Sequence, residues 1–410
     1  MVQRIYILGG AQTDFAQNFS RSNKNLFDLF QVSVKEGLED ANIEAKDIDV
    51  GHVGNFVAEL FTGQGMLGGY FGHVDEGFYG MPSSRHEGAC ASGSLAILAA
   101  MADLESGRYE TACVTGLELM RNVSGEIAAQ NLGAAAWVGR EAADARYLWP
   151  AMFSDLCDVY EERFGLNYAH LAEISKINFS NAKNNPNAQT RKWQFSDASF
   201  MQDDKQNPII EGWMRKQDCG QVTDGAATVV LATADRAKAH CKNHGLSIQD
   251  LAYIKGWGHT TAPMLMATKM EKSDTNGYVF PLTRKAITDA YRRANLSGPN
   301  ELDAIETHDC FSITEYMAIE HFGIADPGKA WQAIEENKID MNGAIPINPS
   351  GGLIGQGHPV GATGVRMLLD GVRQTTETAG DMQVAGARTV ATYNVGGSGT
   401  TNVSFIVSTA

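Results

Sequence analysis

The sequence predicts an α/β protein, because short apolar segments alternate with helical patterns along the chain. Residues 4–10 form an apolar run that ends in glycines, as a buried strand does. Leu26, Phe30, Val34 and Leu38 then recur every four residues, which is the spacing of an amphipathic helix. Alternation of strands and helices is typical of α/β domains.

The second half of the chain repeats this order and indicates an internal duplication. Buried strands are predicted at 110–116 and 226–232 in the first half. The second half has a helical pattern at 284–294, a strand at 303–307, a helix that opens at Gly361, and strands at 387–393 and 403–407. Each half ends in a β-branched strand after a turn that contains glycine, as expected for two copies of one unit.

Residues 118–220 differ from both halves and are predicted to form an inserted loop region, called the cap region below. This segment is polar and contains an Asn/Pro-rich stretch at 184–189, which is typical of loops. We therefore expect a first half at 1–117 plus 221–260, a loop domain at 118–220, and a second half at 261–410.

Composition excludes several classes of protein. With 410 residues and 43% hydrophobic residues the chain can build more than one core. A net charge of -15 disfavours binding to nucleic acid or to anionic lipid. The six cysteines form no CxxC pair, so neither a metal site nor a disulfide framework is expected. Residues 1–20 lack a signal-peptide pattern and no long apolar span occurs, so a cytoplasmic protein is expected.

Cys90 is the first candidate catalytic residue. It stands among small residues at 88–94, and an Ala- and Leu-rich helical pattern follows as far as Glu105. A helix N-terminus offers free N–H groups and the positive end of the helix dipole, which favour a thiolate over a thiol. We expect a nucleophile with a depressed pKa; the alternative is a buried cysteine that only packs.

His358 is the second candidate and lies in the glycine-rich segment 348–364, just before the predicted helix. A glycine-rich turn lets the backbone pass close to a substrate. An imidazole held between Gly357 and Pro359 is therefore a candidate base, although a single histidine is more often structural.

Two further loops follow predicted strands, where α/β proteins carry polar functional groups. In the segment His308-Asp309-Cys310-Phe311, both His308 and Cys310 are candidate acids or bases. The turn at 393–399, which contains Gly396, offers backbone N–H groups for an oxyanion hole.

The cap region concentrates cationic and aromatic side chains: Lys183, Arg191, Lys192, Trp193, Trp213, Arg215 and Lys216. Cations beside aromatic rings suit the phosphates and adenine of a nucleotide, and solvated surface charge is an equal alternative.

Together these motifs resemble those of the thiolase family, in the family's order along nearly the whole chain. Cys90 resembles the acyl-accepting cysteine, and His358 resembles the histidine that activates it. Most thiolases have Asn-Glu-Ala-Phe in the third loop and a second cysteine in the last loop. Here His308–Phe311 and Asn394 stand in those places, which is similar to sterol-carrier-protein-2-type thiolases. In that subfamily the proton-shuttling thiol comes from the third loop, so the resemblance assigns it to Cys310.

The resemblance implies a five-layered α/β/α/β/α thiolase fold of two similar halves with an inserted loop domain. Its catalytic set would be Cys90, His308, Cys310 and His358. One oxyanion hole would use His308 and His358, and the other the N–H groups of Cys90 and Gly396. Coenzyme A would lie under the loop domain, near Lys183, Arg191, Lys192 and Trp193.

The resemblance also implies the activity and the partners. We expect an acyl-CoA C-acyltransferase that cleaves 3-ketoacyl-CoA with CoA or runs the reverse Claisen condensation, with acyl-CoA and CoA as substrates and no permanently bound cofactor. A homodimer or a dimer of dimers is expected, with a small OB-fold protein as a further possible partner. The rival functions are a decarboxylating ketoacyl synthase of the same fold and a non-catalytic acyl-CoA-binding subunit.

Overall fold

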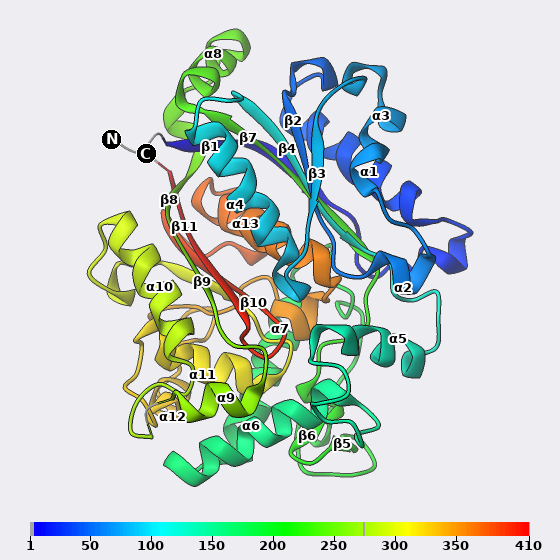
Figure 1. Cartoon of the computed structure of the whole chain (residues 1–410). Helices are drawn as coiled ribbons and strands as arrows, with labels where there is room; N and C mark the ends of the chain where they lie inside the picture. Colours follow the sequence, from blue (N-terminus) through cyan, green and yellow to red (C-terminus); the bar gives the residue numbers. More distant parts are fainter. Residues whose placement is uncertain (1–3, 274, 410) are drawn as a thin grey trace.

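A computed structural model describes residues 4–273 and 275–409 of the chain. Its main sheet has nine strands in the order β3-β2-β4-β7-β1-β8-β11-β10-β9 (Figure 1). The first five come from the first half of the chain and the last four from the second. The two groups join where β1 pairs with β8 at Ile5–Ile254 and Tyr6–Tyr253.

The first half supplies these elements: β1 (Ile5–Gln12), α1 (Leu26–Asp40), β2 (Val50–Gly54), α2 (Ala58–Thr62), α3 (Phe71–Val74), β3 (Ser83–His86), α4 (Ser92–Glu105), β4 (Thr111–Glu118), β7 (Gly225–Thr233) and α8 (Ala234–His244). The second half supplies β8 (Ala252–Thr261), α9 (Met266–Glu271), α10 (Pro281–Ala294), β9 (Ala304–Thr307), α11 (Ser312–Phe322), α12 (Ala330–Glu335), α13 (Val360–Thr375), β10 (Thr389–Gly396) and β11 (Thr401–Thr409).

The strand order confirms the internal duplication. In each half, the last strand of the main sheet lies between the first strand and the last-but-one strand. Thus β7 lies between β1 and β4, and β11 lies between β8 and β10. The predicted strands and helices all overlap observed elements. The exact domain boundaries stay a prediction. Strand β8, which ends at the predicted 260/261 boundary, pairs with β11 from Ala252 to Thr261.

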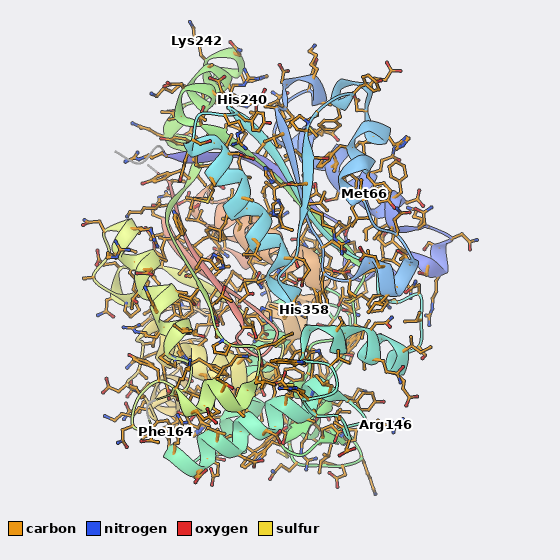
Figure 2. All side chains as sticks on the ribbon, in the orientation of Figure 1. Met66, Arg146, Phe164, His240, Lys242 and His358 are labelled. Atoms are coloured by element: carbon orange, nitrogen blue, oxygen red, sulfur yellow. The ribbon has the colours of Figure 1, made fainter. Side chains whose placement is uncertain are left out.

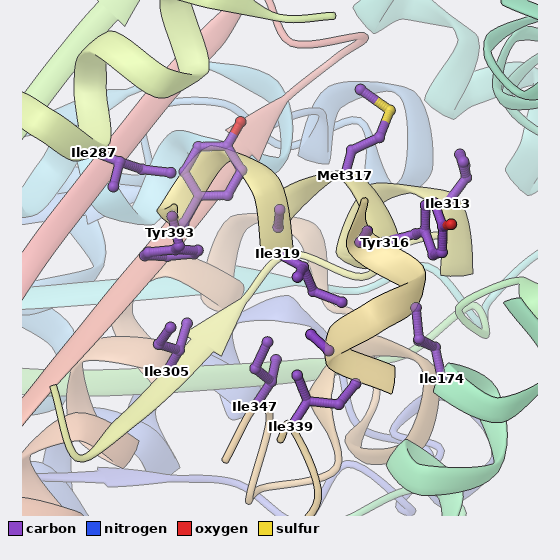
Figure 3. Packing of buried hydrophobic residues seen from close by; sticks show 14 of the residues in the cluster. Ile174, Ile287, Ile305, Ile313, Tyr316, Met317, Ile319, Ile339, Ile347 and Tyr393 are labelled. Carbon is purple, nitrogen blue, oxygen red and sulfur yellow. The ribbon is translucent and has the colours of Figure 1, made fainter. Parts of the chain in front are cut away.

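Three large buried clusters hold the five layers together, and the middle one packs the central helices against both groups of strands. Along β1, Ile5 and Ile7 face the core that holds α4 and α13, whereas Tyr6 and Leu8 face the core under α1. This alternation is that of a sheet with both faces covered. A third core packs α10 and α11 against the second group of strands, and Figure 3 shows part of it. Helices α4 and α13 therefore form the central layer (Figure 1).

The cap region is more ordered than its sequence suggests. It contains α5 (Gly125–Leu132), α6 (Leu148–Phe164), α7 (Tyr168–Ala182) and a hairpin of β5 (Ile209–Glu211) and β6 (Met214–Arg215). Helices α6 and α7 bury apolar residues in the core of the second half, among them Leu156, Tyr160 and Leu171. Both helices also carry polar residues, some of them buried, such as Ser154 on α6 and Asn178 on α7, so the overall polarity of the segment concealed them. Within the described residues no helix has the length and apolarity needed to span a membrane.

Candidate active site

Cys90 lies at the predicted place, in a tight turn (Ala89–Ala91) that leads directly into α4. Ser92 Oγ donates to the carbonyl of Ala89 (2.6 Å) and accepts from the N–H of Gly88 (3.0 Å), which closes the turn. Ala89 has φ 51°, in the left-handed region that few residues with a side chain adopt. Such backbone strain is found most often at functional sites.

The expected depression of the Cys90 pKa is wrong for the free protein. Burial and the nearby carboxyl of Glu118 raise the pKa of Cys90 to about 12, although the N–H groups of Cys90 and Gly397 act in the opposite direction. The helix N-terminus is therefore outweighed by the loss of water around the sulfur, and Cys90 rests as a neutral thiol.

His358 precedes α13 and lies near the middle of the molecule (Figure 2). Its Nδ1 lies 2.8 Å from Thr363 Oγ1, which itself donates to the carbonyl of Pro359 at 3.2 Å. With the hydroxyl proton used in that way, the hydrogen bonds assign the ring proton to Nδ1. Nε2 is then left bare, buried and without a partner among the described residues. Burial and Arg366 lower the pKa of His358 to about 3, so the imidazole is neutral and can accept a proton.

His308 has the opposite tautomer. Its Nδ1 faces two donors, the side-chain amide of Asn394 at 3.0 Å and the backbone N–H of Val395 at 3.4 Å. The Asn394 amide is oriented because its oxygen accepts from Ser94 Oγ at 2.8 Å. The ring proton therefore lies on Nε2, and burial together with His358 lowers the pKa of His308 well below its usual range. His308 is a neutral hydrogen-bond donor.

The three side chains meet at one point. Cys90, His308 and His358 each place a potential ligand atom within 4.8 Å of the others, and the two imidazole rings are perpendicular at 5.1 Å between centroids. The set is compact enough for a metal ion. However, the N–H of His308 Nε2 occupies the nitrogen that would coordinate it, which disfavours metal binding.

Cys310 lines the same cavity as Cys90 and His358. Burial, Cys90 and Asp309 raise its pKa well above the usual range, so it also rests as a thiol. Asp309 holds this loop against the glycine-rich loop, because its carboxylate accepts from the N–H groups of Leu353 (2.5 Å) and Ile354 (3.1 Å). Sequence reasoning missed this role, although Asp309 stands between two predicted site residues.

The turn after β10 brings backbone N–H groups to Cys90. Gly396 lies directly against the Cys90 turn, since a Cβ there would come within 2.0 Å of the Gly88 carbonyl oxygen. The N–H that acts on the Cys90 sulfur belongs to its neighbour, Gly397. The buried Lys269 donates to Ser398 Oγ at 2.6 Å and Thr400 Oγ1 at 3.0 Å, which fixes this turn. Nothing in the local sequence around Lys269 indicates that contact.

The catalytic side chains open into a cavity of about 300 Å³. Its walls are mostly apolar and include Phe56, Leu132, Trp149, Phe153, Val222 and Phe311. Tyr147, Lys216 and Gln221 are among its polar lining residues.

Within the described part of the chain, the cavity lining includes none of Lys183, Arg191, Lys192 and Trp193. Arg191 forms a two-pronged ion pair with Asp14, both contacts being 2.8 Å, which binds the cap region to the first half. Lys183 and Lys192 are exposed, and Trp193 is 36% exposed. The site therefore unites Cys90, His308, Cys310, His358 and the turn at Gly396 but not the four predicted CoA contacts.

Comparisons with known proteins agree with this arrangement. A family model described as "Thiolase, N-terminal domain" matches residues 5–189, and one described as "Thiolase C-terminal domain-like" matches residues 266–409. An acetyl-CoA acetyltransferase of Methanothermobacter thermautotrophicus is 30% identical over 398 residues, which make up 97% of each chain. Sterol carrier protein 2 of Gallus gallus is 28% identical over 97% of this chain and 70% of its own length.

The fold comparison extends the same result. The solved structure titled "Ltp2-ChsH2(DUF35) aldolase" has a TM-score of 0.78 at 20% sequence identity and covers 99% of this chain and 98% of that chain. At that identity the match shows the fold. Because the family models and a relative at 30% identity together span almost the whole sequence, the chain belongs to the thiolase family.

Proposed function

We propose that this protein is an acyl-CoA C-acyltransferase that cleaves a 3-ketoacyl-CoA with coenzyme A, or condenses two acyl-CoA molecules in the reverse direction. One observation carries the proposal. The Cys90 thiol, the Cys310 thiol and His358 with its bare Nε2 line one cavity, and His308 has a ring nitrogen within 4.8 Å of both Cys90 and His358.

The first step is attack by Cys90. His358 Nε2 takes the thiol proton, and the sulfur attacks the 3-keto carbon of the substrate. Because Cys90 and His358 both rest uncharged, transfer of the proton accompanies the attack, without a preformed ion pair. The negative charge that develops on the keto oxygen is met by hydrogen-bond donors, and removal of one such donor typically costs about 3 kcal/mol of barrier. His308 and protonated His358 would supply one set of donors.

The second step breaks the bond between carbons 2 and 3. The acyl group stays on Cys90 as a thioester, and acetyl-CoA leaves as its enolate, to which Cys310 gives its proton. Incoming CoA then gives its thiol proton to the Cys310 thiolate and takes the acyl group from Cys90, whose sulfur regains its proton from His358, while the N–H groups of Cys90 and of the 396–397 turn stabilise the thioester oxyanion. In the reverse direction Cys310 would remove the α-proton of acetyl-CoA.

Coenzyme A would enter through the cap region. The prediction that Lys183, Arg191, Lys192 and Trp193 hold it is retained as part of the proposal, and Lys216 joins them because it lines the cavity. Lys216→Ala and the combined Lys183→Ala/Lys192→Ala variant should each raise the KM for CoA more than they lower kcat. An unchanged KM in one variant removes its residues from the binding site.

Mass spectrometry after incubation with acyl-CoA tests the function directly. Cys90 should gain the mass of one acyl group, and Cys90→Ala should gain none. Thiolysis of 3-ketoacyl-CoA by the wild type should then depend on added CoA. Condensation that requires malonyl-CoA and releases CO₂ would support a ketoacyl synthase instead. Absence of any acyl-Cys90 would support a binding subunit.

The assembly and the compartment are also proposed. A homodimer or dimer of dimers follows from the family resemblance, and light scattering of the purified protein measures its mass. The cytoplasm is proposed from the residue pattern at 1–20 and the lack of a long apolar span in the sequence. A small OB-fold partner is supported by the Ltp2 relative in fold, whose title names ChsH2(DUF35) as a second component. Purification of the chain from its own cells, followed by mass spectrometry of co-purifying proteins, tests for it.

A further inference from the structure

The catalytic cavity is larger and more apolar than an acetyl group requires. Its volume of about 300 Å³ is roughly twenty times the 10–15 Å³ that a cavity needs to hold one water. The sulfur end of CoA shares this space, but an acetyl group adds only two carbon atoms to it. Among the described lining residues, Lys216 is the one permanently charged side chain. Apart from this one lysine, the mostly apolar walls suit an apolar chain.

One aromatic side chain lines this cavity next to the Cys310 loop. Phe153, on α6, is 3% exposed, and its ring stacks on Phe311 with centroids 4.6 Å apart and planes 26° apart. Phe311 directly follows Cys310, so the stack lies beside the reacting centre. Trp149, one helical turn before Phe153, lines the same wall.

Phe153 also borders a second, smaller cavity of about 20 Å³. Met317 and Tyr393, both labelled in Figure 3, line that cavity together with Phe280 and Thr314. This volume holds about one water. Phe153 is therefore a wall residue of both cavities.

We infer that the acyl group transferred through Cys90 is an apolar chain longer than acetyl, and that Phe153 sets the maximum length of that chain. The inference rests on the proposed acyltransferase function. In this arrangement the chain lies against Phe56, Leu132 and Trp149 and stops at the Phe153 ring. The small cavity beyond the ring is unused unless Phe153 becomes smaller.

Thiolysis of 3-ketoacyl-CoA substrates of increasing length, from acetoacetyl-CoA upward, tests the inference. The wild type should have its highest kcat/KM beyond acetoacetyl-CoA and then lose about tenfold or more once the chain meets Phe153, as expected for one carbon too many in an apolar pocket. Phe153→Ala should move this drop to longer chains, and the milder Phe153→Leu should move it less. Phe164→Ala is the matched control, since Phe164 is on the same helix and lines neither cavity.

The possible outcomes separate the inference from the function on which it rests. If Cys90 is acylated but acetoacetyl-CoA is the best substrate, or if Phe153→Ala and Phe153→Leu keep the wild-type length profile, the inference is overturned while the function stands. If no acyl-CoA acylates Cys90 in the wild type, the proposed function fails and the inference fails with it.

Discussion

In each half of the molecule, one helix of the central layer begins immediately after a loop that reaches the active site. Helix α4 follows Cys90 in the first half, and α13 follows His358 in the second. The two helices occupy equivalent places in a duplicated strand order, but one loop brings a thiol and the other an imidazole. The duplication has thus placed nucleophile and base opposite each other without any closeness in sequence.

The distance between thiol and base consequently depends on how closely α4 and α13 pack. Glycines allow this contact: a Cβ on Gly93 would lie 2.7 Å from the carbonyl oxygen of Gly361, and one on Gly364 would lie 2.4 Å from the nitrogen of Ser94. Glu118 adds a further connection, since its carboxylate accepts from the N–H groups of Phe56 (3.0 Å) and Gly361 (3.2 Å). The relative positions of Cys90 and His358 therefore depend on how α4 and α13 cross.

The largest expected effect separates the two thiols. Cys310→Ala should lose exchange of the α-proton of acetyl-CoA with deuterium by about 10²–10⁴-fold, the usual contribution of an acid or base. Acylation of Cys90 should continue, because His358 can still take its proton. NMR of acetyl-CoA in deuterated buffer measures the exchange. Exchange at the wild-type rate would reassign the second base to His308.

The second prediction compares Cys90 with an ordinary thiol. Because its pKa is raised to about 12 and that of His358 is lowered to about 3, the thiolate fraction of Cys90 should grow about tenfold per pH unit. Alkylation by iodoacetamide should therefore rise about 100-fold from pH 6 to pH 8 and keep rising above pH 9, where a free cysteine with a pKa near 8.5 levels off. A constant rate between pH 6 and pH 8 would instead indicate a thiolate–imidazolium pair.

The third prediction disturbs the helix crossing itself. Gly364→Ala would push a Cβ against Ser94 and to within 2.6 Å of Asn394 Oδ1, and such overpacking typically costs about 1–3 kcal/mol of the free energy of unfolding. Gly371→Ala, two turns later on α13, is the control, because the closest contacts of its Cβ would be with the Val407 side chain, at a slightly tight 3.3–3.5 Å. Urea unfolding should separate the two variants. Equal midpoints would mean that the crossing tolerates more space than the contacts indicate.

The sequence predicted most strands, both halves and the side chains that the structure brings together around Cys90, because those signals are local. The local conformational preferences of glycine-rich turns, such as those beside Cys90 and His358, and of short β-branched strands are the same in any tertiary context. The ionisation of Cys90 could not be predicted, since it depends on burial by residues far along the chain, including Glu118. Helices α6 and α7 were missed because their apolar faces are visible only once the core of the second half is known.

The predicted CoA contacts also show that a sequence cannot reveal which charged residues pair in the folded protein. In the sequence Arg191 looks like a free cation. In the structure this cap-region residue forms an ion pair with Asp14, near the start of the first half, which neutralises its charge. Nothing in the sequence distinguishes Lys216 from the other cations, but it directly follows β6 of the β5–β6 hairpin and lines the cavity. Which cation meets a ligand is decided by tertiary pairing.

The smallest expected effect concerns the tautomer of His358. Thr363→Val keeps the shape of the side chain but removes the oxygen that receives the Nδ1 proton of His358. A net hydrogen bond contributes about 0.5–1.5 kcal/mol, so kcat should fall by roughly 3- to 10-fold. The KM for CoA should stay the same, because Thr363 is remote from the cavity mouth and acts only by positioning the base. Thr363→Ser should restore most of the rate, since it restores the hydroxyl.

Thr375→Val, which removes a hydroxyl bonded to the Gly371 carbonyl near the end of the same helix, should leave kcat unchanged and controls for helix stability. A Thr363→Ser variant as slow as Thr363→Val would mean that the methyl group of Thr363, and not its oxygen, holds His358 in place.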